Sequence, residues 1–456
     1  MSKVRKDITI SSQNQITEGV IWQQLLIFFF PIVLGTFFQQ LYNTVDTVIV
    51  GRFVGKEALA SVGGSAGQLV NLVVGFFTGL TSGAAVVVSQ FWGARDHARV
   101  KEGVHTAYAF SITASLAITA LGILLTPMLL RWMHTPQELM ADSVLYLRIY
   151  YVGILFVFIF NTGSSILRAA GDSRRPLYYL AVCCILNIAL DIFFVLVCKM
   201  GVAGVSIATV LSQAVSAFLV TRALMRARDG LHLQLRGIRF AKRILRSQLY
   251  IGVPTGLQSA MYSISNIIIQ TAINRFGTDS MAAWAAFWKL DAVFWMISSA
   301  FGISITTFVG QNYGASKYAR IKKSVYICAG MQSAATVLIS AVFVLFKAPL
   351  LSIFTVDRQV IEIGCLMIAI LAPFYVFFTP VEILSGALRG IGDVLIPTAI
   401  TICGVCLLRI GWVLVALPMR PEISTIMAGY PVTWLLSGTA FLIYYACRMR
   451  RFNGNN

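Results

Sequence analysis

The chain has 456 residues, of which 57% are hydrophobic and only 12% are charged, against roughly 25% charged in an ordinary soluble domain. So few charges cannot cover a water-facing surface, which excludes a soluble globular enzyme and a disordered protein. A net charge of +18 would suggest nucleic acid as the partner of a soluble protein, but here the basic residues lie between long apolar runs. A lipid bilayer is the remaining solvent, and a helix that spans it needs about 20 apolar residues.

The apolar runs predict an all-α polytopic membrane protein with twelve transmembrane helices. The first run begins at Ile21; it is too long for a signal-peptide core and lacks a small-residue cleavage site, so we expect it to be retained. The second and eighth runs are long enough to require tilt or an exposed extension. The twelve expected spans are residues 21–50, 58–91, 103–130, 140–166, 177–198, 202–222, 248–274, 281–310, 323–346, 361–387, 396–417 and 424–446.

Basic residues are distributed unevenly over the loops between these spans. Of the 36 Lys and Arg residues, 25 fall in segments on the side of the N-terminus and 8 on the opposite side. Because positively charged loops stay in the cytoplasm, we expect both termini there and the protein in the cell membrane. The same bias accounts for the net charge without a nucleic-acid partner.

The chain repeats itself at an interval of 221 to 223 residues. Three separated motifs recur in the same order, and each half holds six expected spans. An even number of spans brings both halves into the membrane from the same side, which gives a parallel internal repeat of two six-helix bundles, a pattern typical of transporters. The matching pairs are Pro31 and Pro254, residues 90–94 and 311–315, and residues 168–172 and 389–393.

This repeat divides the chain into five expected parts. They are a cytoplasmic N-terminal segment (1–20), a first bundle (21–222), a basic cytoplasmic linker (223–247), a second bundle (248–447) and a cytoplasmic tail (448–456). In folds of this kind the substrate site lies between the two halves.

Ionisable side chains within spans are energetically expensive, so each one suggests a functional hypothesis. Asp46 in the first span and Asp191 in the fifth lie at similar distances from their outer turns, roughly 12–14 Å at 1.5 Å per residue. Thr209 reaches the same depth in the sixth span, and Asn187 lies one turn before Asp191 on the same helix face. Two carboxylates, an amide oxygen and a hydroxyl form an oxygen-rich site suited to a small cation. The alternative is a structural role, with the two acids capped by backbone groups or paired with Arg148.

Residues 41–51 (LYNTVDTVIVG), the RAAGD turn at 168–172 and its echo at 389–393 resemble the multidrug and toxic compound extrusion (MATE) family. The resemblance extends from about residue 15 to residue 450. It implies two six-helix bundles around a V-shaped cleft, and an antiporter coupled to Na⁺ or H⁺ that exports bulky, often cationic aromatic compounds by alternating access. We expect a monomer whose partners are small-molecule xenobiotics and membrane lipid, with no cofactor beyond the coupling ion.

The resemblance also implies a cation site in the first bundle. The residues that match it are Asp46, Asn187, Asp191 and Thr209. Asp46 and Asp191 would then be the Na⁺ ligands. Tyr146 and Asn161 match family positions near the same polar network, although the depth count places Asn161 deeper than Asp191.

Other polar residues of the first span have two interpretations each. In the family a bend in the first helix is associated with coupling, so Pro31 is either a coupling element or a fixed structural kink. Gln39 and Tyr42, one to two turns before Asp46, either face the cleft or form a polar seam between helices.

The second half departs from part of the family. Many members carry a glutamate in the seventh span, where this sequence has Asn266 and Gln258, and we expect Asn266 to line the cleft. Asp291 is either a contact for a cationic substrate or a structural residue. Lys289 lies two residues before it, so the two side chains point to different faces of the helix. Glu382 is a weaker substrate-binding hypothesis, because it follows Pro380 in a region expected to be broken or kinked.

Two rival functions are retained. A lipid-linked sugar flippase of the same wider superfamily should line its cleft with several basic side chains for a pyrophosphate, and only Arg148, Lys289 and Arg409 fall within the spans. An intramembrane enzyme would need a clustered catalytic set, and the spans contain none, so no catalytic residue is expected. The sequence has no Walker A motif, so an ion gradient is the expected drive.

Overall fold

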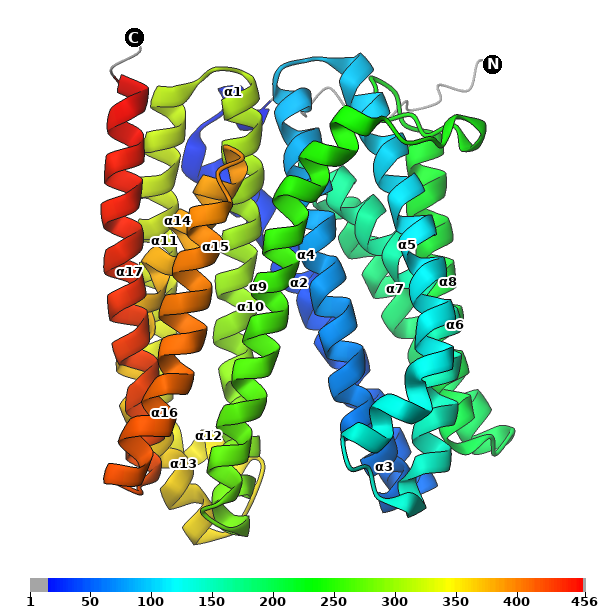
Figure 1. Cartoon of the computed structure of the whole chain (residues 1–456), viewed down its shortest axis with the longest axis vertical. Helices are drawn as coiled ribbons and strands as arrows, with labels where there is room; N and C mark the ends of the chain where they lie inside the picture. The colour runs from blue at the N-terminus through cyan, green and yellow to red at the C-terminus, as the bar shows by residue number, and fades with distance from the viewer. Residues whose placement is uncertain (1–14, 454–456) are drawn as a thin grey trace, which may run out of the picture.

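The computed structural model describes residues 15–453 as helices joined by turns, with no strand in that range. Residues 1–14 of the expected N-terminal segment and residues 454–456 of the expected tail lie outside the described residues. The long helices form two groups, one from each half of the chain (Figure 1). The short helix α1 (Gln15–Glu18) and the last turns of α17 lie at one end of the molecule, which we call the terminal end; the opposite end is the far end.

The helices follow one another along each half with short connections. The first half contains α2 (Ile21–Ile49), α3 (Lys56–Gly63), α4 (Ser65–Gly93), α5 (His97–Trp132), α6 (Gln137–Ala169), α7 (Arg174–Asp191) and α8 (Gly201–Met225). The second half contains α9 (Lys242–Asn274), α10 (Thr278–Gly314), α11 (Tyr318–Leu345), α12 (Lys347–Ser352), α13 (Arg358–Leu371), α14 (Thr379–Gly390), α15 (Leu395–Ile400), α16 (Leu408–Met419) and α17 (Ile423–Asn453). Shorter turns are π-helical at Val50–Val54, Ile192–Val197 and Thr401–Leu407, and 3₁₀-helical at Leu235–Gly237 and Ala372–Phe378.

The predicted all-α polytopic fold is confirmed. Within the described residues, eleven helical segments are long and apolar enough to cross a membrane. The helix α9 is the twelfth of comparable length, with 33 residues, but its serines, glutamines and basic first turn make it more polar. The second expected span is two helices, α3 and α4, and the tenth is interrupted by the 3₁₀ turn at Ala372–Phe378, next to Pro380.

The repeated RxxGD motif is a helix-ending turn in both halves. The N–H of Gly171 donates to the carbonyl of Arg168 at 2.9 Å, and that of Asp172 to Leu167 at 2.9 Å. The same pattern recurs at Gly392 and Asp393. Both glycines have a positive φ, 96° and 87°, a conformation that side chains with a Cβ rarely adopt. The motif therefore fixes where α6 and α14 end.

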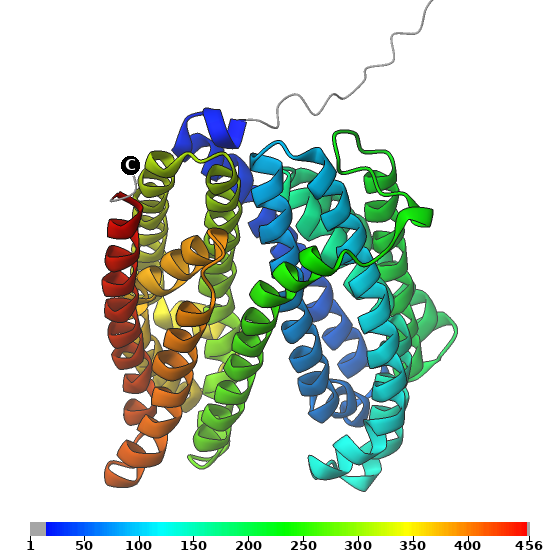
Figure 2. The same ribbon diagram turned by 45° about the horizontal axis from the view of Figure 1, so that its top comes forward.

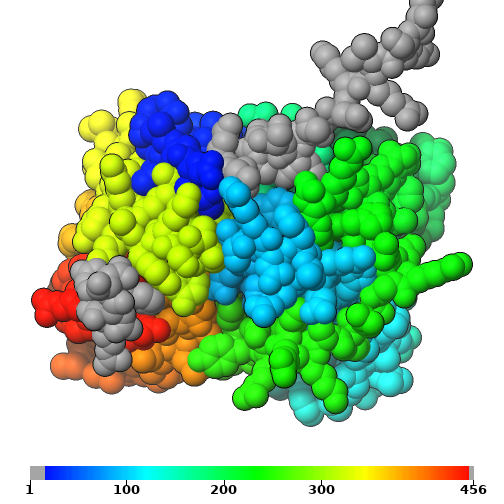
Figure 3. All heavy atoms as spheres, turned by 90° about the horizontal axis from the view of Figure 1, so that it is seen from above, coloured from blue at the N-terminus to red at the C-terminus, as the bar shows by residue number. Residues whose placement is uncertain are grey.

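The two halves meet at the terminal end and diverge toward the far end (Figures 1 and 2). Seen from the terminal end, they form a continuous surface with no opening between residues near 95 and residues near 315 (Figure 3). Small residues allow this closeness, because a Cβ on Gly79 would collide with the backbone of Gly256, and one on Gly83 with that of Gly252. Close backbone approach through small residues is the usual way in which helices associate within membranes.

Two helices cross from one half to the other, and each contains a proline. Pro31 lies close to the crossing of α2, whereas α9 still packs against α4 at Gly256, beyond Pro254. The first turns of α2, through Phe29 and Ile32, belong to the core of the second half. After Pro31 the helix joins the first half, where Gly35 contacts Leu180 of α7. The helix α9 does the reverse, starting against the first half and ending in the core of the second (Figure 2).

Candidate functional site

Two carboxylates of the first half lie together toward its far end. Asp46 lies on α2 and interacts with Asp191, the last residue of α7. Asn187, one turn before Asp191, and Thr209 on α8 face the same Asp46 carboxylate. The structure therefore brings together the four side chains that the sequence predicts for a cation site. We call Asp46, Asn187, Asp191 and Thr209 the cation cluster.

Several polar atoms of the cation cluster are buried without a partner. Asn187 and Asp191 are 0% exposed. Both carboxylate oxygens of Asp191, one of Asp46, and both polar side-chain atoms of Asn187 have no hydrogen-bond partner among the described residues. The Thr209 hydroxyl donates to the carbonyl of Val205 at 3.0 Å, which leaves its oxygen free to accept. Buried polar groups normally have partners, and this concentration of unpaired polar atoms has the chemistry to hold a cation or an ordered water.

Irregular backbone adjoins both carboxylates. Asp191 is followed directly by the π-helical turn at Ile192–Val197, and Asp46 lies four residues before the one at Val50–Val54. Such turns are rare and frequently occur at functional sites, where they re-aim side chains. The sequence patterns did not predict them.

Tyrosine side chains surround the cation cluster. Tyr146 on α6 interacts with both carboxylates, and Tyr42 on α2 interacts with Asp46. Sequence reasoning missed Tyr150, whose ring lies 6.1 Å from that of Tyr146, and Gln213 on α8, whose amide donates to the Tyr42 hydroxyl at 3.4 Å. The spacing of Tyr150, one turn after Tyr146, is a signal that could have found it.

The remaining predicted residues of the first half lie apart from the carboxylates. The Arg148 side chain is exposed, and none of the ion pairs among the described residues joins it to an acid. Gln39 is exposed and contacts Tyr42. Asn161 lies fifteen residues beyond Tyr146 on α6, about 22 Å along the helix at 1.5 Å per residue, so the structure separates it from the cation cluster.

The second half contains a different polar centre. Asp291 is 5% exposed and accepts hydrogen bonds from Tyr375 at 2.5 Å and from Trp295 at 2.6 Å. Arg409, 2% exposed, interacts electrostatically with Asp291 and places its guanidinium carbon 3.9 Å from the centre of the Tyr430 ring. Both Asp291 oxygens thus have donors, and Lys289 is exposed on another face, as predicted.

Asn266 and Glu382 lie on different helices of the second half. Asn266 is half-buried on α9. Glu382 lies on α14 and contacts Gly302 of α10 so closely that a Cβ there would collide with its carboxylate. It lines a cavity of about 300 Å³ between the two halves.

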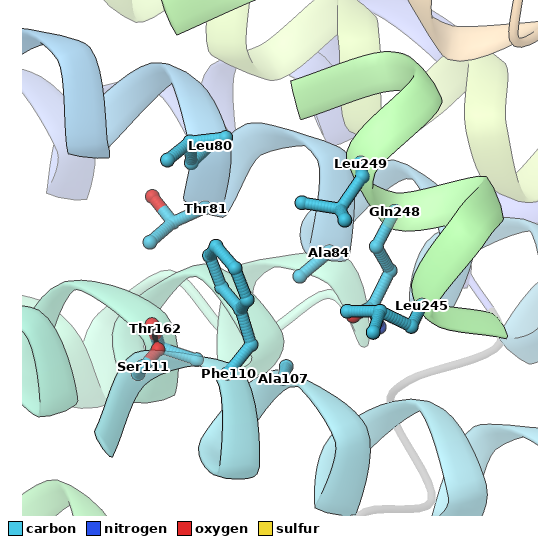
Figure 4. A pocket seen from close by; sticks show the side chains of 10 residues that line it. All are labelled: Leu80, Thr81, Ala84, Ala107, Phe110, Ser111, Thr162, Leu245, Gln248 and Leu249. Atoms are coloured by element: carbon cyan, nitrogen blue, oxygen red, sulfur yellow. Dashed lines mark hydrogen bonds between the residues drawn. The ribbon is translucent and has the colours of Figure 1, made fainter. Parts of the chain in front are cut away.

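A second cavity, of only about 10 Å³, lies where the start of α9 meets α4 and α5. Figure 4 shows Phe110, Leu245 and Leu249 around it. A volume of this size holds about one water. It is a packing gap that marks how tightly α9 is docked against the first half.

Two repeated helical bundles that meet at one end, with a buried polar site inside one bundle, are typical of a membrane transporter. The MatE family model matches residues 31–193 and again residues 254–414, one match in each half. The chain therefore belongs to the MatE family, as the sequence resemblance predicted. Members of this family are transporters rather than enzymes, and they need no cofactor.

Relatives and solved structures agree with this assignment. The chain is 28% identical over 442 residues to "Probable multidrug resistance protein YoeA" of Bacillus subtilis, covering 93% of each protein. It is 26% identical over 382 residues to "Probable multidrug resistance protein NorM" of Thermotoga maritima, covering 82% of this chain and 80% of the relative. Its fold is similar, with a TM-score of 0.90 and 21% identity over 96% of this chain and 98% of the other, to the outward-facing conformation of a multidrug resistance MATE family transporter.

Proposed function

We propose that this protein is a cation-coupled antiporter that exports bulky, often cationic aromatic compounds across the cell membrane as a monomer. The unpaired buried oxygens of the cation cluster carry this proposal, because they supply the hard donors that Na⁺ prefers and the carboxylates that can take up H⁺. The similarity to multidrug resistance proteins of Bacillus subtilis and Thermotoga maritima supports drug-like compounds as substrates.

The crossing of α2 from one half to the other supports a coupling between cation binding in the first half and the arrangement of the two bundles. Its second half carries Asp46, while its first half packs against the other bundle through Phe29, whose ring stacks on Phe301 at 4.1 Å. A cation that binds between Asp46 and Asp191 favours the arrangement of α2 in which the two carboxylates are close. A ligand shifts a conformational equilibrium by binding its states unequally, so cation binding biases how the bundles meet.

Transport into vesicles under imposed Na⁺ and H⁺ gradients tests the proposal. Wild-type protein should accumulate ethidium, a fluorescent aromatic cation, when either gradient is imposed in the antiport direction. Asp191→Asn should abolish gradient-driven accumulation at matched protein abundance, and Glu57→Gln, which changes an exposed carboxylate on α3, should retain it. Gradient-driven transport by Asp191→Asn would contradict the proposed site.

The proposed orientation places the terminal end in the cytoplasm. The loop that joins the two halves lies at that end and exposes Arg236. In a variant with Arg236→Cys and the native exposed cysteines replaced, an impermeant thiol reagent should label position 236 in inverted vesicles and not in intact cells. Labelling in intact cells would reverse the orientation.

The flippase alternative has less support. Arg148 and Lys289 are exposed, and Arg409 is engaged by Thr433 at 3.2 Å and by aromatic rings. None of these three residues therefore lines the cavity between the halves; its two arginines, Arg168 and Arg389, share it with the acid Glu382, which disfavours a pyrophosphate.

A further inference from the structure

The cavity between the two bundles is polar and contains charged side chains from both. Its volume is about 300 Å³, at the lower end of the range for small-molecule sites. Hydroxyl groups from α4, α6, α9 and α10 line it, together with three charged residues, Arg168 on α6 and Glu382 and Arg389 on α14. Arg168 and Arg389 are equivalent positions of the internal repeat, 221 residues apart.

Both guanidinium groups point away from the terminal end. Arg168 donates to the hydroxyl of Ser165 at 3.1 Å, and Arg389 to that of Ser385 at 3.4 Å. Each acceptor lies one turn earlier in the helix, on the side of the membrane interior. Long side chains at a membrane surface usually extend toward water. These two instead extend into the cavity.

The two arginines differ in their charge balance. Glu382 lies seven residues before Arg389, two turns away on the same face, and interacts with it electrostatically. The repeat equivalent of Glu382 is the neutral Asn161, seven residues before Arg168. None of the ion pairs among the described residues involves Arg168. The cavity therefore contains one guanidinium that is not balanced by an acid.

Contacts across the interface hold both arginines in place. The Gln311 amide donates to the carbonyl of Ala169 at 2.7 Å, and the Gln90 amide to that of Gly390 at 2.8 Å. Each carbonyl belongs to the residue after one of the arginines, and each glutamine comes from the opposite bundle. Closure at the terminal end thus assembles two like charges in one cavity, where an anion would reduce their repulsion.

We propose that this cavity binds the anionic group, a carboxylate or a phosphate, of a small solute, with Arg168 as its principal donor. A guanidinium matches the geometry of both groups and forms charge-assisted hydrogen bonds with them. The hydroxyls of Ser82 and Ser165 supply further donors on the same cavity wall. The inference rests on the proposed function only in taking the space between the bundles as a place where solutes bind, and it adds an anionic group to the cationic aromatic class.

Binding of inorganic phosphate to the purified full chain tests this, measured by titration calorimetry at constant ionic strength in phosphatidylcholine nanodiscs. Wild-type protein should bind phosphate saturably, and Arg168→Gln should weaken binding about tenfold or more, the effect of losing one charge-assisted hydrogen bond. Arg174→Gln removes the same charge from an exposed site on α7 and should leave the affinity unchanged. Equal affinities for these two variants, or no saturable binding to the wild type, would overturn the proposal.

Two further variants test the charge balance without removing an arginine. Asn161→Glu copies the second half's arrangement into the first and should weaken phosphate binding about tenfold. Glu382→Gln frees Arg389 and should strengthen it. If neither substitution changes the affinity in these directions, Arg168 and Arg389 do not hold the anion.

Two controls separate the anion site from a lipid-headgroup site and from the cation cluster. Phosphate affinity should be the same in nanodiscs that contain phosphatidylglycerol; displacement by that lipid would assign the cavity to a headgroup and overturn the solute proposal. Asp191→Asn should bind phosphate like the wild type, because the measurement uses no cation gradient. Failure of coupled transport and failure of anion binding are therefore distinguishable.

Discussion

Asp46 is a residue at which the two halves of the repeat differ strongly in chemistry. Its equivalent at the interval of 223 residues is Ile269, which is 0% exposed in the core of the second half. A buried aliphatic side chain needs no hydrogen-bond partner, whereas a carboxylate buried at the equivalent position needs a cation, a proton or a hydrogen-bond donor. The cation cluster is thus a property of one half only.

Sodium binding to the cation cluster should depend on pH. Under the proposed function, Na⁺ and H⁺ would compete for the Asp46 and Asp191 carboxylates, so Na⁺ affinity should weaken as the pH falls and strengthen as it rises. Asp46→Asn removes one of the two competing groups and should reduce both the affinity and its pH dependence. Isothermal titration of purified protein with NaCl at several pH values measures this, with Glu57→Gln as the unaffected control. An affinity that does not vary with pH would rule out a shared site.

Asp291 should contribute to stability rather than to cation coupling. Asp291→Ala leaves the Tyr375 hydroxyl and the Trp295 N–H buried without their acceptor, at a cost of about 1–3 kcal/mol for each unsatisfied group. We expect a lower unfolding temperature in detergent, with Na⁺ affinity unchanged. Lys289→Ala, an exposed substitution on the same helix, should change neither quantity. Loss of Na⁺ binding in Asp291→Ala would instead make this residue the leading cation carrier.

Side chains that are rare in membranes could be found from the sequence, and ordinary ones could not. Asp46 and Asp191 stand out because a charge within a span is costly without a function. Tyr150 and Gln213 belong to residue types that occur widely in such helices; the spacing of Tyr150 from Tyr146 is a signal, but no pattern in the sequence distinguishes Gln213. The spans that hydropathy predicts end before Arg168 and Arg389, and such boundaries do not show that a side chain turns back toward the membrane interior.

The α2 and α9 helices connect the two bundles, and neither crossing could be predicted from the sequence. The repeat of Pro31 and Pro254 was visible in the sequence. That Pro31 lies close to a change of bundle, and Pro254 does not, depends on tertiary contacts between residues far apart in the chain. The hydropathy pattern gives the length of a helix but not the partner on each of its faces.

Pro31→Ala should reduce coupling while cation binding persists. Proline interrupts the backbone ladder of α2 between its contacts with the second half and its contacts with the first. Alanine restores the missing N–H and stiffens α2. Cation binding at Asp46 should then have less effect on how the two bundles are arranged. We expect slower gradient-driven ethidium transport with Na⁺ affinity unchanged in the same preparation. Unchanged transport would make Pro31 a fixed kink with no role in coupling.

At the scale of the whole molecule, the repeated motifs close the terminal end because each half donates a hydrogen bond to the equivalent motif of the other half. Gln90 of the first half binds the carbonyl of Gly390, and Gln311 of the second half binds that of Ala169. Gly93 and Gly314 are packed just as reciprocally, since a Cβ on either would collide with the backbone of the opposite glutamine. The sequence showed that these motifs repeat, but not that the two copies contact one another.

This reciprocity predicts how the closed end opens when the glutamines are changed. Gln90→Leu and Gln311→Leu each remove one interhelical hydrogen bond and leave a buried carbonyl without its donor, which should disfavour closure by about 1–3 kcal/mol. Because the two bonds are equivalent by the repeat, the single variants should have similar effects and the double variant a larger one. When the closed form loses a few kcal/mol of stability, the population of the open form rises to a level that can be measured.

Double electron–electron resonance, which measures the distance between two spin labels, reports this population when the labels lie on either side of the terminal end. Ala98 and Ala319 are repeat equivalents, both exposed, on α5 and α11 beside the closed junction, so Ala98→Cys with Ala319→Cys carries the labels once the native cysteines are replaced. The labelled parent should show one short distance, each single leucine variant an added longer component, and the double variant mostly the longer one. Gln270→Leu removes a glutamine whose hydrogen bond is exposed, at the other end of α9, and should leave the distribution unchanged. If the double variant keeps the short distance alone, closure depends on glycine packing, and the glutamine exchange is incidental to it.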